Sequence, residues 1–482
     1  MSAFSEKLSF YVARSGMSLK SLSEASGIEN TLLIKIRKGT RPAKSKEGML
    51  RLMDALQLSV SDRRDLAEAW EIDQIGEEEF KEYLSIRTLL ESMRDINSPT
   101  FARGTAAAPP FVDVRAIPLN TPVEVNHALH TLIESACASP DSSLLLHTNL
   151  TNAYLMNALM IAVSDHPELP VSHIVSFLPA SNRGSYPNAN IERLGRMFPL
   201  LFSGSSYMPY YSYEQDIPTD NLFLFPNVLI ADHYVISASP SWNAGFFSSN
   251  EAIINSARFL FHLQLSSCKR FGHMYLSLDE QMQFFAETFN RTGRSWRYLI
   301  SRQPCILPLI SEDDAREALI PGAVTDETIE TFFRRYRAIP LQHLSNMTSF
   351  FMLDGLRTFM DTGIIYEVPG CVAKPLPLRA RQRVLRQLIT ASRSGAFHPQ
   401  IVKQTKFDIP RQADVLVQGG LTVFSLLPST DVLSPSCFFT LDTGMSDVIE
   451  RFMAFLEKKD FWTYTQEESL KMIEDMLKAS EG

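Results

Sequence analysis

Apolar residues at helical spacing, interrupted by short polar breaks, fill the first seventy residues of the chain. Phe4, Leu8 and Val12 recur every four residues, so they share one face of a predicted first helix. The same spacing predicts further short helices over residues 19–26 and 29–38, around residues 50–56 and around residues 66–70. Gly27 ends the second helix and Gly39 the third, because glycine interrupts helical patterns. The pattern therefore predicts a small all-helical domain at the N-terminus.

A longer helix is predicted next, over residues 73–96, with three glutamates at residues 77–79 near its N-terminal end, where the helix dipole favours negative charge. An apolar face would be formed by Phe80, Leu84, Leu89 and Met93. That face either packs on its own domain or forms a dimer contact, and the sequence leaves both open. Residues 97–121 are rich in Pro, Ala, Thr and Gly, which is typical of a linker.

Beyond residue 121, helical patterns alternate with short apolar runs. Strands are predicted over residues 143–147, 173–177, 222–224 and 228–236, and helices over residues 123–138, 154–164 and 251–265. This alternation indicates an α/β or α+β body. We therefore predict a multidomain chain, in which an all-α domain over residues 1–72 precedes a large α/β (α+β) region.

Two stretches of this body show a similar order of elements. Residues 227–248 contain three apolar runs followed by a helical pattern, and residues 414–440 contain three such runs followed by another. Chance similarity and an internal repeat both remain open. A repeat would divide the body into two related lobes, residues 122–275 and residues 276–482, with room for a ligand between them.

Charge is distributed unevenly along the 482 residues, whose net charge is -8. Residues 1–60 contain ten bases and five acids, a balance of +5, so the remainder carries -13. A basic head on an acidic body is the arrangement expected of a DNA-reading domain joined to a regulatory one. It argues against a protein that coats nucleic acid along its whole surface.

The spacing of the cysteines and the length of the apolar runs indicate in which cellular compartment the protein is located. The five cysteines are widely spaced and form no CxxC motif. We therefore expect free thiols rather than disulfides or a zinc knuckle, and no metal site. The first residues, MSAFSEKLSF, do not resemble a signal peptide, and no window approaches 18 uninterrupted apolar residues. These features predict a cytoplasmic protein with no membrane partner.

Residues 19–38 read LKSLSEASGIENTLLIKIRK, and this segment resembles the helix-turn-helix of the Xre/Cro/C1 family of repressors. The family's core positions are occupied here by Leu22, Ser23, Gly27, Ile28, Leu33 and Ile36. The apolar members bury the crossing of two helices, and Gly27 can adopt the left-handed conformation that a sharp turn requires. Ser23 stands where the family usually has alanine, and Arg37 where it often has glutamate. The resemblance covers roughly the first 70 residues.

The resemblance implies that residues 29–38 enter the major groove of double-stranded DNA. By family position, base edges would be contacted by Asn30, Thr31, Ile34 and Lys35. Phosphates would be contacted by Ser18, Lys20, Arg37, Lys38, Arg41 and Lys44. Asn30 could pair with adenine and Lys35 with guanine, whereas phosphate contacts would set affinity and register.

Common catalytic signatures are missing from the body. We find no GxxxxGK[ST], GxGxxG, HExxH or GxSxG motif, and the histidines are scattered. We therefore predict that the chain is not an enzyme and uses no cofactor. The body is weakly similar to the phospholipase-D-type fold of some bacterial sensors. The HxK signature is absent because Tyr234-Val235 follows His233, so the resemblance implies a catalytically silent version.

One aromatic cluster, Tyr207, Tyr210, Tyr211 and Tyr213, either lines a ligand pocket or packs within its own domain. The leading hypothesis is a transcriptional regulator, a repressor by family resemblance. It would bind DNA as a homodimer and sense a small-molecule or peptide effector through its body. The alternatives are an enzyme with an autoregulatory DNA-binding head and a protein-interaction module of antitoxin type.

Overall fold

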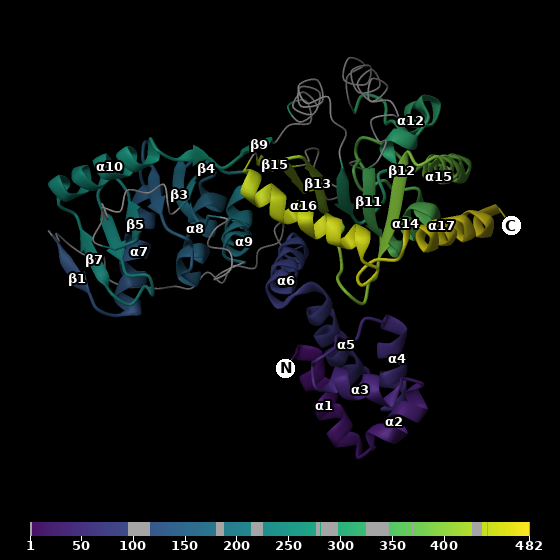
Figure 1. Ribbon diagram of the computed structural model, residues 1–482. Coiled ribbons are helices and arrows are strands. Elements are labelled where there is room, and N and C mark those ends of the chain that lie inside the picture. Colours follow the sequence, from purple (N-terminus) through teal and green to yellow (C-terminus); the bar gives the residue numbers. More distant parts are fainter. Residues whose placement is uncertain are drawn as a thin grey trace. The chain divides into compact units, whose positions relative to one another are not determined.

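The computed structural model describes residues 2–94, 116–179, 188–213, 225–275, 280, 297–323, 347–368, 370–426, 436–440 and 442–481. These residues form two compact units, one within Met1–Ser85 and the other from Ile86 onward (Figure 1). The chain is thus multidomain, with a helical unit followed by an α+β unit that contains two mixed sheets.

The first unit is built from short helices: α1 (Ala3–Ser15), α2 (Leu19–Ser26), α3 (Asn30–Arg37), α4 (Lys46–Ala55) and α5 (Val60–Ile75). Four of them begin at serines whose hydroxyl accepts a hydrogen bond from the backbone of the first turn, namely Ser2, Ser18, Ser45 and Ser59. Their apolar faces meet in one core around Leu8, Leu22, Leu33 and Leu66, all fully buried. Capping and periodicity therefore fix where these helices start and which side they bury.

Gly76 separates α5 from α6 (Glu77–Ser92). The break has a local cause, since Gly76 has a φ of 103°, which a helix cannot accommodate. Residues 95–115, most of the predicted linker, lie outside the described residues, and β1 (Ile117–Leu119) follows them.

The second unit contains two groups of strands. The first comprises β1, β2 (Leu144–His147), β3 (Val171–Phe177), β4 (Tyr207–Tyr213), β5 (Asn227–Ile230), β6 (Val235–Ala238), β7 (Gly245–Ser248) and β8 (Lys269–Arg270). The second comprises β9 (His273–Tyr275), β10 (Tyr298–Ser301), β11 (Met347–Met352), β12 (Phe397–Val402), β13 (Ala413–Gln418), β14 (Leu421–Leu426) and β15 (Ser436–Thr440).

Helices lie between these strands. In the first half they are α7 (Pro122–Cys137), α8 (Ala153–Asp165), α9 (Ala189–Leu201) and α10 (Glu251–Leu265). In the second half they are the 3-10 turn η2 (Leu307–Leu309), α12 (Glu312–Ala318), α14 (Leu353–Thr362), α15 (Leu378–Arg393), α16 (Thr443–Lys458) and α17 (Gln466–Glu481). Within the described residues, none of the helices is both long and apolar enough to cross a bilayer.

The strand predicted over residues 228–236 is wrong in one respect. The structure divides it into β5 and β6, an antiparallel hairpin in which Ile230 pairs with Val235. Asp232 and His233 occupy the turn, where two polar residues interrupt an apolar run. The strand predicted over residues 222–224 lies outside the described residues.

The two sheets have corresponding strand orders. The first is β1-β7-β6-β5-β2-β3-β4-β8, and the second, read from its other edge, is β9-β15-β14-β13-β10-β11-β12. Each has three parallel strands beside an antiparallel meander, and β8 is an additional edge strand of the first. The segments paired by sequence pattern therefore occupy equivalent places, β5–β7 with α10 and β13–β15 with α16. We call the first sheet and its helices lobe 1, and the second sheet and its helices lobe 2.

Candidate nucleic-acid interface

Helices α2 and α3 are joined by a tight turn at Gly27, whose φ of 67° lies in the left-handed region. The turn is fastened by Ser23, whose Oγ donates a hydrogen bond of 2.5 Å to the carbonyl oxygen of Ile28. Leu22 and Leu33 are fully buried, Ile28 and Ile36 nearly so, and Ser23 is half-buried. The six predicted core positions thus lie where α2 meets α3, and serine at position 23 contributes a bond that alanine could not.

Residues predicted to read bases lie on α3. Asn30 is its first residue, and Asn30, Thr31 and Lys35 are exposed, while Ile34 is half-buried. The Thr31 hydroxyl donates to the exposed carboxylate of Glu29, which precedes the helix. Glu29 is a neighbour that the sequence reasoning missed, and it places a negative charge beside the residues predicted to contact bases.

Most residues predicted to contact phosphates are exposed around α2 and the end of α3: Ser18, Lys20, Lys38, Arg41 and Lys44, with Arg37 half-buried. Ser18 already has a structural role, because its Oγ accepts a hydrogen bond of 3.1 Å from the backbone N–H of Ser21. Within the described residues, none of the five bases forms an ion pair.

Arg51 is a base that the sequence reasoning did not assign to this surface. It is exposed on α4, and its Nη1 lies 3.9 Å from where a Cβ on Gly27 would stand. Its guanidinium is therefore beside the α2–α3 turn. No local pattern reveals this, because the approach of α4 to α2 joins residues more than twenty positions apart.

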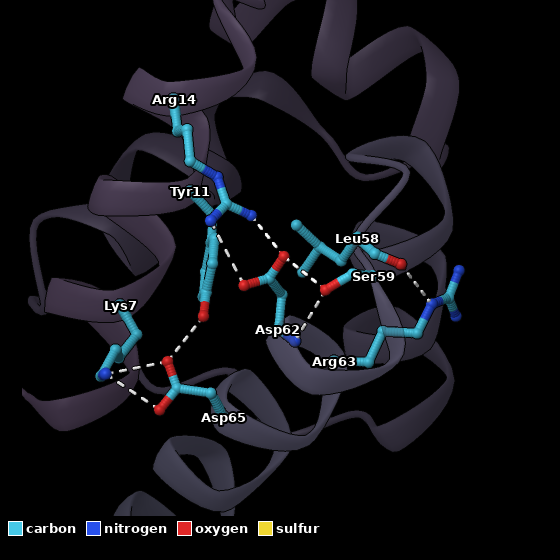
Figure 2. A network of polar contacts seen from close by, with 8 residues as sticks. All are labelled: Lys7, Tyr11, Arg14, Leu58, Ser59, Asp62, Arg63 and Asp65. Atoms are coloured by element: carbon cyan, nitrogen blue, oxygen red, sulfur yellow. Dashed lines mark hydrogen bonds and ion pairs between the residues drawn. The ribbon is translucent and has the colours of Figure 1, made fainter.

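Bases on α1 are placed differently. Lys7 pairs with Asp65 at 2.8 Å and Arg14 with Asp62 at 2.5 Å, while the Tyr11 hydroxyl donates to Asp65 (Figure 2). Hydrogen bonding from Arg14 lowers the pKa of Asp62 to about 2. These charges hold α1 against α5, and we call this group the α1–α5 network.

The bases around α2 and α3 differ from this network because they form no ion pair within the described residues. We call them the α2–α3 basic surface, which consists of Lys20, Lys35, Arg37, Lys38, Arg41 and Lys44.

The predicted tyrosine cluster is divided by its strand. All four residues lie on β4, where alternation puts Tyr207, Tyr211 and Tyr213 on one face and Tyr210 on the other. Tyr207 and Tyr211 are buried, and the Tyr213 hydroxyl donates to Asp442 at 2.8 Å. The pKa of Tyr211 is raised, chiefly because the side chain is buried.

Lobe 2 contains two acidic residues that the sequence reasoning did not single out, Glu367 and Asp414. Burial raises the pKa of both carboxyls, and the like charge of Asp414 raises that of Glu367 further. Burial and these two acids also raise the pKa of the nearby Cys305 thiol, so it is protonated at neutral pH. No cluster of three His, Cys, Asp or Glu side chains in the described part of the chain could hold a metal ion.

Comparison with known proteins gives no family: no family model and no curated protein matches the chain. Several solved structures are similar over part of it, among them two enzymes and a chromatin protein. A polyphosphate kinase from Porphyromonas gingivalis is 12% identical, over 80% of this chain and 59% of its own, with a TM-score of 0.22. A phosphatidylserine synthase from Haemophilus influenzae is 10% identical, over 82% and 98%, with a TM-score of 0.24. TrmBL2, an archaeal chromatin protein with a novel mode of DNA binding, is 10% identical, over 43% and 61%, with a TM-score of 0.20.

These neighbours correct one prediction. The lack of common catalytic motifs led us to predict that the chain is not an enzyme, and two of the three structures named above are enzymes. Short motifs reveal only active sites whose residues are close in sequence. Their absence therefore does not show that a chain lacks catalytic activity. The chain spans 59% of the polyphosphate kinase, and no activity is transferred from it.

Proposed function

We propose that the chain is a sequence-specific DNA-binding transcriptional regulator of the helix-turn-helix type. The observation that carries the proposal is the α2–α3 basic surface, where bases that have no carboxylate partner in the described part of the chain lie on and beside two helices joined at a left-handed glycine. An unpaired base on a surface can neutralise a phosphate without first breaking an ion pair.

In this proposal α3 lies in the major groove with its N-terminal end toward the bases. Asn30 and Lys35 are exposed on this helix and have the chemistry to read adenine and guanine. Lys20, Lys38, Arg41 and Lys44 contact phosphates on either side of the groove. Arg51 joins them, since it is exposed beside the turn.

Dimer formation belongs to the same proposal. A single module of this size buries about 600–1,000 Å² on DNA, which is small for tight specific binding. Two copies on a pseudo-palindromic operator would double that contact. The α+β unit would sense an effector that favours one arrangement of the two heads, and its two corresponding lobes would belong to the phospholipase-D-type fold.

A second candidate is an enzyme with a DNA-binding head. Glu367 and Asp414 favour it, because carboxyls whose pKa is raised by burial are suited to general acid catalysis. Under this hypothesis the body would convert a substrate at the pair, and the head would regulate the gene that encodes it.

The DNA-binding proposal is tested by selecting the full-length protein against a random duplex library. The Asn30→Ala, Lys35→Ala double variant is selected in parallel. The matched control is Lys478→Ala, which removes an exposed base from α17. We expect a two-fold symmetric motif from the wild type and the control, and none from the double variant. Selection of no motif by the wild type would overturn the proposal.

A further inference from the structure

Each lobe has a set of polar residues at corresponding places on its sheet. In lobe 1, Leu146 pairs with His173 on one side and with Leu229 on the other. In lobe 2, Leu299 pairs in the same way with Ser349 and Leu416. The registers therefore match Thr148 with Ser301, His173 with Ser349, and Asn227 with Asp414. We call these two sets the polar rows of lobes 1 and 2.

The polar row of lobe 1 is satisfied from within. The Thr148 hydroxyl donates to Asn227 Oδ1 at 2.8 Å, and Asn227 Nδ2 donates to the carbonyl of Ser239 at 2.9 Å. His173 Nε2 donates to the Thr148 carbonyl at 2.7 Å, so its Nδ1 accepts from the Tyr207 hydroxyl at 2.5 Å. This arrangement is what buried polar groups require.

The polar row of lobe 2 lacks such partners. Ser349 is fully buried and Asp414 is 6% exposed, yet among the described residues neither Ser349 Oγ nor Asp414 Oδ1 has a hydrogen-bond partner. Glu367 Oε2, which is buried nearby, has none either. Ser301 does not compensate, since its hydroxyl donates to the carbonyl of Gln303. The imidazole that completes the row in lobe 1 is replaced in lobe 2 by the much smaller serine.

The side chains of Ser349 and Asp414 lie on one side of the sheet. Asp414 pairs with Ser301, and Ser349 pairs with Leu299 two residues earlier on the same strand, so both side chains project from one face. Ser301 and its partner Asp414 lie at the carboxyl end of β10, where α/β sheets commonly bind ligands, whereas Ser349 is the third of the six residues of β11. Glu367 lies in the turn after α14 and is half-buried as a residue, and its carboxyl is close enough to Asp414 for the two charges to interact.

We propose that the polar row of lobe 2, together with Glu367, binds a small organic cation that carries N–H donors, a protonated amine or guanidinium, between Asp414, Glu367 and Ser349. The three side chains offer hydrogen-bond acceptors, and within the described residues no positive group lowers the pKa of either acid, so a bound cation would favour their ionised form. A charged N–H donor supplies both the missing hydrogen bonds and the missing charge. An organic cation fits better than a metal ion, because the described residues contain no cluster of three metal ligands.

This inference names the effector class for the regulatory body, and to that extent it rests on the proposed function. Its test uses the full chain without DNA, so the two can fail separately. The probes are n-butylammonium chloride and butylguanidinium chloride. The controls are tetramethylammonium chloride, which has the charge but no N–H donor, and 1-butanol, which has no charge. Calorimetry measures affinity, and the shift of thermal unfolding measures stabilisation.

We expect saturable binding of at least one N–H cation and none of the controls. Asp414→Asn and Glu367→Gln should each weaken binding by about 10-fold or more, and Ser349→Ala by about fivefold, as expected for lost charge-assisted and neutral hydrogen bonds. Glu467→Gln, which alters an exposed acid of α17, should bind like the wild type. If one acid variant does not fold, the remaining variants still show whether the cation binds at these side chains.

Two outcomes would overturn the inference. One is that neither N–H cation binds saturably, or that tetramethylammonium binds as well as they do. The other is that the acid variants bind like the wild type. A DNA motif without cation binding would refute only this inference, and cation binding without a DNA motif would refute only the regulator.

Discussion

The bases of the first unit fall into two groups that differ in what they face. On the α1–α5 network, Lys7 and Arg14 are joined to aspartates that lie 58 and 48 residues further along the chain. On the α2–α3 basic surface, bases of the same chemistry, all exposed except the half-buried Arg37, have no carboxylate partner among the described residues. The difference teaches that total basic charge is a poor guide to a binding surface. What matters is which bases the fold has left unpaired.

The two lobes offer a similar contrast. Lobe 1 satisfies its polar row with His173, Tyr207 and Asn227, whereas lobe 2 leaves Ser349 and Asp414 with buried oxygens that have no partner. An equal topology therefore does not give equal hydrogen bonding among the described residues. In both comparisons, the candidate site is the region whose polar groups lack partners within the described chain.

The largest expected effect comes from Leu33→Ala. Leu33 is fully buried between α3 and its neighbours, and truncating such a leucine costs about 2–5 kcal/mol. Denaturant unfolding of the full chain should show this loss in the transition of the first unit. The α2–α3 surface should lose DNA affinity without any change in charge. Unchanged stability would show that the core around α3 is not as described.

The next largest effect should come from the α3 side chains that are proposed to read DNA bases. Asn30→Ala and Lys35→Ala should each cost about 1–3 kcal/mol of binding free energy and relax specificity at one base pair. Fluorescence titration against the selected operator and its single-base variants measures both. The matched control is Lys7→Ala in the α1–α5 network, which should leave specificity unchanged. An equal loss from Lys7→Ala would remove the distinction between the two groups.

A smaller effect is expected from Ser23→Ala. The serine hydroxyl donates to the Ile28 carbonyl across the turn, and such a bond contributes about 0.5–1.5 kcal/mol. Thermal unfolding should therefore show a modest destabilisation. Operator affinity should be retained, since alanine is the usual residue at this position in the Xre/Cro/C1 family, which this segment resembles. A large loss of affinity would mean that the bond shapes the DNA-binding surface itself.

The smallest effect is a pH dependence in the α1–α5 network. The pKa of Asp62 is lowered to about 2 by its bond to Arg14, so the interaction stabilises the fold above the ordinary aspartate pKa of about 4. That contribution is lost as the pH falls from about 4 toward 2. The difference in unfolding free energy between wild type and Arg14→Ala should be constant above about pH 5 and shrink below about pH 4. A difference that persists at low pH would contradict the pairing.

Local signals were enough to predict much of the first unit. Ser18 and Gly27 mark the ends of α2 through capping and turn chemistry, which act over a few residues. The alternation of strands and helices likewise indicated an α/β or α+β body. The hairpin at Asp232 was missed because nine residues rich in apolar side chains resemble one strand as much as two.

Long-range pairings could not be predicted. Nothing near Lys7 or Arg14 indicates that these bases are paired, and nothing near Arg51 places it beside Gly27. Glu367 and Asp414 are 47 residues apart, and only folding buries them together. Sequence reasoning therefore assigned bases by type and position, whereas the fold decides which of them are paired.

The salt dependence of operator binding tests the central claim most directly. Two double variants, Arg41→Ala with Lys44→Ala and Lys7→Ala with Arg14→Ala, remove the same charge from the two groups. Affinity is measured from low to high salt for both variants and the wild type. We expect the first variant to reduce the slope of log affinity against log salt by about 2, since each phosphate contact contributes about 0.9, and the second to leave the slope unchanged. Equal slopes for the two variants would contradict the account, because the unpaired bases would then not be the ones that meet DNA.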